Sequence, residues 1–137
     1  MKLDPSAFVA DSELIQALEK QSSVIVCGRD LILFRQGDVP EGLYILDKGE
    51  ATLMMRDSAG GEVMSVEALP NSLLGLPGLI GNMQYTLTAI GHKDAELSYV
   101  TRDDFITLIR TNPHLSLKVL EVLAAEVRSA RQAIRDL

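Results

Sequence analysis

The sequence predicts a mainly β domain, an antiparallel β-roll or jelly roll with flanking helices and a long C-terminal helix. From residue 21 to 100, short apolar runs alternate with turn residues. Many short strands at this spacing are typical of jelly rolls, sandwiches and barrels. Helical periodicity replaces the pattern at 5–20 and 101–137. A chain of 137 residues suits one domain, and we expect 1–137 to fold as a single unit.

One or two short helices are expected between residues 5 and 20. Asp4-Pro5 is a favourable helix start, because Asp accepts hydrogen bonds from free N–H groups and Pro suits the first helical position. Asp11 offers a second start. The apolar residues that follow it share one helical face: Leu14, Ile15 and Leu18.

Short apolar runs in the middle of the chain are expected to form the strands. They lie at 24–26, 31–34, 43–46, 51–55, 63–69, 86–90 and 97–100. The Gly60-Gly61 pair predicts a hairpin between two of them, because glycine adopts the positive φ that a tight turn needs.

Two helices are expected after residue 100. Thr101, with Asp104 three residues later, resembles a capping box. Asn112-Pro113 ends this first helix and starts the next, with Asn112 as its N-cap.

The last helix carries an apolar stripe with the 3-4 spacing of a heptad repeat. We expect it to form a homodimer seam, while the first turns, near Leu115, Leu117 and Val119, pack on the roll. The seam consists of Leu120, Leu123, Val127, Ala130, Ile134 and Leu137.

Composition excludes several classes of function. The net charge is −6 and aromatic residues make up 4% of the chain, so neither a basic footprint nor a stacking surface for nucleic acid is evident. No catalytic motif and no cluster of metal ligands appears among His92, His114 and Cys27. The N-terminus has no signal peptide and no apolar run is long enough to span a membrane, so we expect a cytoplasmic protein that is not an enzyme.

The segment 71–81 is unusual, because three glycines and a proline interrupt an otherwise apolar stretch. A glycine-rich turn that leads into a short helix exposes backbone N–H groups and can hold an anion. The alternative is a tight buried connection in which only glycine fits. Spacing alone leaves both interpretations open.

The order of these segments resembles the cyclic nucleotide-binding domain family, in the branch that forms the sensor half of CRP/FNR-type bacterial regulators. The strand-turn 35–38 (Arg-Gln-Gly-Asp) and the following block 43–51 carry the resemblance, together with the Gly-Gly hairpin and the two C-terminal helices. The resemblance covers about residues 8–137. It implies a β-roll that holds a ligand against a long helix, and a dimer formed through that helix.

The family's phosphate-binding cassette is altered in this chain. Gly75 matches the cassette glycine, but Leu76 stands where the resemblance implies a Glu for the ribose hydroxyl. Tyr85 stands where it implies an Arg for the cyclic phosphate. Because each charged hydrogen bond contributes ~1.5–3 kcal/mol, we expect cyclic AMP to bind weakly or not at all. The candidate ligand-binding residues are Gly75, Leu76, Gly78, Gln84, Tyr85, Thr86, Thr88 and Arg131.

A regulatory domain that senses a small ligand is therefore the leading functional hypothesis, with no cofactor expected. The alternative is a structural or protein-interaction module that uses the same roll without a ligand. CRP/FNR regulators continue into a helix-turn-helix domain, and no such DNA-reading element is expected within these residues.

Overall fold

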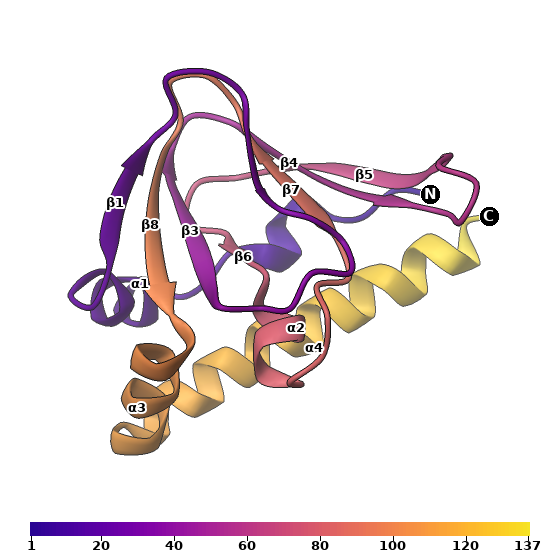
Figure 1. Cartoon of the computed structure of the whole chain (residues 1–137). Helices are drawn as coiled ribbons and strands as arrows, with labels where there is room; N and C mark the ends of the chain where they lie inside the picture. Colours follow the sequence, from indigo (N-terminus) through magenta and orange to yellow (C-terminus); the bar gives the residue numbers. More distant parts are fainter.

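The computed structural model describes residues 1–137 and contains two four-stranded sheets flanked by helices (Figure 1). The elements, in chain order, are η1 (Pro5–Phe8), α1 (Ser12–Glu19), β1 (Ser23–Val26), β2 (Leu31–Phe34), β3 (Gly42–Lys48), β4 (Ala51–Arg56), β5 (Glu62–Ala68), β6 (Leu73–Leu74), α2 (Leu76–Ile80), β7 (Thr88–Gly91), β8 (Glu96–Thr101), α3 (Arg102–Thr111) and α4 (Pro113–Arg135).

The strand order confirms the predicted β-roll. One sheet has the order β1-β8-β3-β6 and the other β2-β7-β4-β5, and every pair within them is antiparallel. Strands that are distant in the sequence therefore lie side by side, such as β1 with β8 and β2 with β7. The short strand β6 was not predicted, because two residues are too few to show an alternating pattern.

Strand β3 separates two hydrophobic cores, because its successive side chains point to opposite faces. Leu43 and Ile45 pack with the helices, in a core that α1, α3 and α4 complete. Leu46 packs inside the roll with Phe34 and Leu53. A strand buried on both faces is continuously apolar, as 43–46 is.

The N-terminal helices begin where the sequence indicated. The Asp4 carboxylate accepts a hydrogen bond from the backbone N–H of Ser6, and Asp11 accepts one from Glu13. The apolar face of α1 is buried as expected, through Leu14, Ile15 and Leu18.

The predicted hairpin joins β4 and β5. Gly60 has a φ of +84°, and Oδ1 of Asp57 accepts hydrogen bonds from the backbone N–H groups of Ala59 and Gly61. Gly60 supplies the positive φ, while the aspartate satisfies the turn's free donors.

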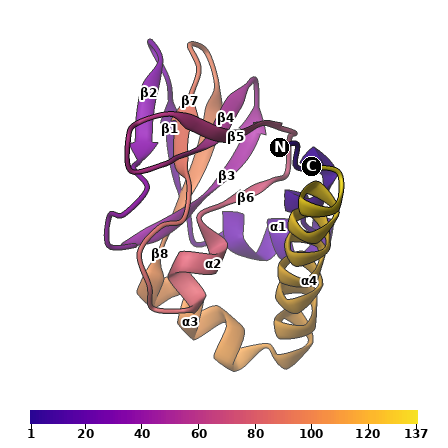
Figure 2. The ribbon, with the colours of Figure 1, turned by 90° about the vertical axis from the view of Figure 1, so that its right-hand side faces the viewer.

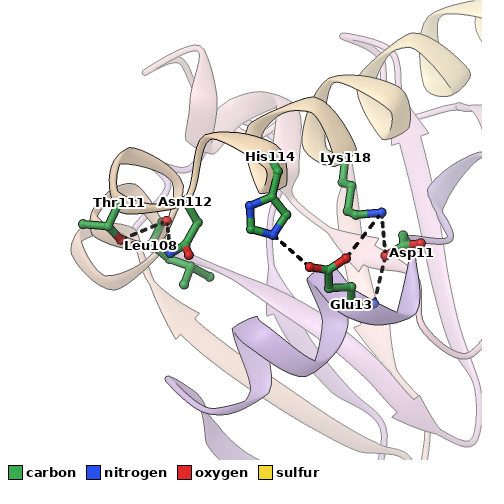
Figure 3. A network of polar contacts seen from close by, with 7 residues as sticks. All are labelled: Asp11, Glu13, Leu108, Thr111, Asn112, His114 and Lys118. Atoms are coloured by element: carbon green, nitrogen blue, oxygen red, sulfur yellow. Dashed lines mark hydrogen bonds and ion pairs between the residues drawn. The ribbon is translucent and has the colours of Figure 1, made fainter.

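The junction of α3 and α4 confirms one capping prediction and corrects another. The Thr101 hydroxyl accepts a hydrogen bond from the backbone N–H of Asp104 at 3.2 Å, as an N-cap does. Asn112 does not cap α4 with its side chain. Its Nδ2 instead donates to the carbonyl of Leu108 at 3.0 Å and closes the C-terminal end of α3 (Figure 3). Pro113 removes one free N–H at the start of α4, so fewer donors there need a cap.

Polar contacts fix α4 against the N-terminal helices. Nζ of Lys118 lies 3.1 Å from Oδ1 of Asp11, and Nε2 of His114 lies 2.8 Å from Oε1 of Glu13 (Figure 3). Further along the helix, the hydroxyl of Ser129 accepts a hydrogen bond from the backbone N–H of Asp4 at 2.7 Å. The two chain ends lie close together in consequence (Figure 2).

Helix α4 has two different apolar faces. The face turned to the body of the protein comprises Leu115, Val119, Val122, Ser129 and Ala133, all of which are buried. The predicted seam lies on another face: Leu120, Val127 and Ile134 are 57%, 51% and 60% exposed, Leu137 is fully at the surface, and Leu123 and Ala130 are half-buried. Leu117 was expected to pack on the roll but is 64% exposed, because it points away from the buried face.

Candidate functional site

A cavity of about 170 Å³ lies where the interior of the roll meets α4. Its lining comes from the N-terminal segment, β2, β4, β5, the start of α2, the segment before β7, and α4. The lining residues are Leu3, Phe8, Phe34, Leu53, Met55, Met64, Gly75, Pro77, Gly78, Tyr85, Thr86, Leu87, Glu126 and Ala130. No arginine, lysine or histidine is among them, so the wall is apolar and carries no positive charge.

Gly75 forms the turn that brings α2 beneath the roll. Its φ is +98°, and a Cβ atom at this position would lie 2.8 Å from Cε1 of Tyr85 and 3.3 Å from the Phe34 ring. Glycine is therefore required twice here, by the left-handed backbone and by the close approach of two aromatic rings. This geometry agrees with a tight connection in which only glycine fits.

Tyr85 occupies the place where the resemblance implies an arginine. Its ring stacks on Phe34, with centroids 3.9 Å apart, and its hydroxyl donates to the carbonyl oxygen of Gly42 at 2.5 Å. Burial raises the pKa of Tyr85 to about 12, so the phenol is neutral at physiological pH. The side chain therefore closes part of the roll interior as a neutral wall and offers no cation.

The predicted ligand residues divide into two groups. Gly75, Gly78, Tyr85 and Thr86 line the cavity, with Thr86 exposed at its rim.

The remaining candidates lie elsewhere. Leu76, the first residue of α2, is fully buried in the core between the helices and β3, outside the cavity lining. The hydroxyl of Thr88 accepts a hydrogen bond from the backbone N–H of Gln36. Gln84 and Arg131 are exposed and outside the cavity lining.

Glu126 lines the cavity, although the sequence analysis did not single it out. Burial raises the pKa of its carboxyl to about 8, from an ordinary value of 4.5. Its Oε2 atom is buried and has no hydrogen-bond partner within the protein. A sequence signal for this placement exists: Glu126 continues, at helical spacing, the buried face formed by Val119, Val122 and Ser129.

The two histidines and the cysteine lie outside this cavity. His92 lies between Thr52 and Asp30, and His114 pairs with Glu13 on the surface. Burial raises the pKa of the Cys27 thiol and disfavours its thiolate. No group of three or more His, Cys, Asp or Glu side chains could hold a metal ion. None of the helices combines the length and apolar composition that crossing a bilayer requires.

A family model, the cyclic nucleotide-binding domain, matches residues 24–112. The chain belongs to this family. Among curated proteins it is similar to the cyclic AMP receptor protein of Thermus thermophilus, with 30% identity over 99 residues. That match covers 72% of this chain and 45% of the relative, so the chain spans less than half of the relative's length.

Two solved structures share the fold of this cyclic nucleotide-binding domain. The catabolite activator protein of Thermus thermophilus superposes with a TM-score of 0.79 at 23% identity, covering 96% of this chain and 62% of that one. CprK in complex with o-chlorophenolacetic acid superposes with a TM-score of 0.72 at 14% identity, covering 94% of this chain and 53% of that one. The likeness shows that they share the fold of this chain.

Proposed function

We propose that this chain is the effector-binding domain of a CRP-type regulator, without catalytic activity, and that its effector is a small, mainly apolar molecule rather than cyclic AMP. The observation that carries this proposal is the cavity between the roll and α4, whose lining contains no basic residue.

A cyclic phosphate would find no counter-ion in this cavity. Moving an unpaired anion from water to an apolar site is strongly unfavourable, and Tyr85, at the arginine position, donates its only proton to Gly42. The other altered position, Leu76, is buried in the core shared with the helices and does not line the cavity. The absence of both polar contacts weakens the binding of a nucleotide, whereas an apolar molecule is stabilised by burial against the same walls.

Two further facts support a small apolar effector. A cavity of about 150 Å³ lined by aliphatic and aromatic side chains is large enough to hold benzene, and this one measures about 170 Å³. CprK, which shares the fold, is known in complex with o-chlorophenolacetic acid, a small aromatic molecule. At 14% identity, this likeness is a precedent for the fold and does not transfer the ligand.

We infer that the domain works as a homodimer through α4. The stripe of Leu120, Val127 and Ile134 is more than half exposed, although the helix already buries a different apolar face. Soluble monomers rarely leave such a stripe uncovered, and a second copy of the helix matches its heptad spacing. Ala130 belongs to the stripe and also lines the cavity, so an occupied cavity would lie next to the protomer contact.

Thermal unfolding with cyclic AMP, cyclic GMP and a set of single-ring aromatic compounds tests the effector proposal. A ligand at 100 times its Kd stabilises the native state by ~2.7 kcal/mol, which raises the melting temperature by several degrees. We expect a shift with at least one aromatic compound and none with the nucleotides at 1 mM. The variant Leu53→Phe fills part of the cavity with an aromatic ring. Its melting temperature should no longer rise when an aromatic compound is added.

Two results would contradict the proposal. Low-micromolar affinity for cyclic AMP by calorimetry would show that the apolar wall does not exclude the nucleotide. An absence of any shift, together with an intact dimer, would favour the alternative of a ligand-free interaction module.

A further inference from the structure

One oxygen of the Glu126 carboxyl, Oε2, is an unsatisfied polar atom in an otherwise apolar cavity. Its Oε2 atom is buried and has no hydrogen-bond partner. The residues one turn away on α4, including Val122 and Ala130, offer it no positive charge. Leaving a buried polar group without a partner costs ~1–3 kcal/mol, so folded proteins rarely keep one without a reason.

The surroundings of Glu126 offer it no cation. The N-terminal segment contributes Leu3 and Phe8 to the cavity wall, and the β4–β5 hairpin contributes Met64. Tyr85 is the only other ionisable group in the lining, and its hydroxyl is already bonded to a backbone carbonyl. An incoming molecule is therefore the partner that the cavity lacks.

The charge of that partner follows from the carboxyl. An ammonium group donates a charge-assisted hydrogen bond to a carboxylate, which is about twice as strong as a neutral one. A protonated Glu126 could also donate to a ligand carboxylate or phosphate, but that anion would keep an unpaired charge in a cavity whose lining holds no cation. A hydroxyl group would satisfy the hydrogen bond without the charge.

We propose that the cavity binds a small apolar amine, whose hydrocarbon body lies between the roll and α4 and whose ammonium group donates to the carboxylate of Glu126. This inference rests on the proposed effector function and narrows it to a chemical class. The bound state contains an ion pair, so a Glu126 that is protonated in the empty cavity releases its proton to solvent when the amine binds.

Calorimetry on the whole chain tests the inference by comparing the affinities of three compounds that share a phenyl ring and differ in their polar group: benzylamine, benzyl alcohol and benzoate. We expect benzylamine to bind at least tenfold more tightly than benzyl alcohol, and benzoate to bind least. In Glu126→Gln, benzylamine should lose at least tenfold in affinity while benzyl alcohol changes little. Glu121→Gln is the matched control, because Glu121 is an exposed glutamate on the same helix.

Proton release gives a readout that a purely structural role would not change. Titrations at pH 7 in two buffers with different ionisation enthalpies should show a net release of protons when benzylamine binds. Glu126→Gln should abolish this release, and Glu121→Gln should retain it.

The outcomes separate the inference from the proposed function. If benzyl alcohol binds as tightly as benzylamine, or if Glu126→Gln leaves benzylamine affinity unchanged, the amine inference is wrong and the apolar effector pocket stands. If none of the three probes binds at millimolar concentration, both the inference and the effector pocket fail. If Glu126→Gln changes the mass in sedimentation and leaves the preference among probes unchanged, Glu126 belongs to a protomer contact, and the inference is overturned.

Discussion

The hydroxyl of Tyr85 donates a hydrogen bond to the carbonyl oxygen of Gly42, 43 residues earlier in the chain, at a distance of 2.5 Å. The bond is buried and joins the segment before β7 to the start of β3. Tyr85, which stands where the resemblance implies an arginine, is therefore part of the roll's structure.

Tyr85→Phe should destabilise the domain by ~1–3 kcal/mol, because it leaves the buried Gly42 carbonyl without its donor while the stacking on Phe34 remains. Urea unfolding measures the change. Tyr44→Phe is the matched control, since the Tyr44 hydroxyl makes a longer bond of 3.3 Å to Leu33. Equal effects of the two substitutions would contradict a special role for the Tyr85 bond.

Gly75→Ala should cost more stability than Gly60→Ala. Both glycines have a positive φ, which strains any other residue by about 1 kcal/mol or more. A Cβ atom at Gly60 meets open space, whereas one at Gly75 lies 2.8 Å from the Tyr85 ring. The difference between the two free energies of unfolding isolates the steric contact, and its absence would show that the ring moves aside freely.

Glu126 should make the stability of the domain fall as the pH rises from 5 to 8. The folded protein keeps the proton on this carboxyl up to a pKa of about 8, whereas the unfolded chain releases it near 4.5. Between these values the folded state binds more protons, so each pH unit removes ~1.4 kcal/mol from the free energy of unfolding.

The measurement is urea unfolding of the wild type and Glu126→Gln at pH 5, 6.5 and 8. The stabilisation from Glu126 should be fully present below the pKa of its carboxyl in the unfolded chain and lost as the pH rises through its pKa in the folded protein. Across this window the free energy of unfolding should fall by an amount on the order of 3 kcal/mol. Glu126→Gln should flatten the profile. Parallel profiles for the two proteins would mean that the carboxyl ionises at its ordinary pH.

Glu substitutions at Val127 and Ile134 should convert a dimer of about 30 kDa, twice the chain's 14.9 kDa, into a monomer. Both side chains are more than half exposed, so the double variant Val127→Glu/Ile134→Glu should fold normally and lose only the protomer contact. Sedimentation gives the mass. Arg135→Glu, at an exposed position of the same helix that faces away from the stripe, is the control, and a monomeric wild type at tens of micromolar would refute the dimer.

Local signals explain why much of the fold is predictable. Asp4, Asp11 and Thr101 cap helices because the side-chain oxygen of each accepts a hydrogen bond from a free backbone N–H group. The donor lies only two or three residues further along the chain, so the sequence alone shows the cap. Gly60 marks its hairpin in the same way. Asn112 was misassigned because its amide could satisfy either helix, and only the backbone path at the junction selected the carbonyl of Leu108.

The candidate site was predictable only in part. Gly75 and Tyr85 were found because they stand at cassette positions, and both line the cavity. Leu76 stands at such a position too, yet the start of α2 turns it into the core beneath the helices. The burial of Glu126 does not follow from its place in the sequence, because a glutamate on an amphipathic helix is ordinarily solvated and this one is covered by the N-terminal segment that packs on α4.

The sequence by itself determined the order of the strands and helices apart from β6, and the family resemblance with its uncharged residues at 76 and 85, since these depend on local periodicity and residue identity. The tertiary structure decided which face of α4 is buried, where Leu76 points, and that Glu126 reaches an apolar cavity. Those properties arise from contacts between segments that are distant in the sequence, such as Asp4 with Ser129, 125 residues apart. Helix α4 carries two apolar stripes, and its 3.6-residue period does not specify which one the roll covers.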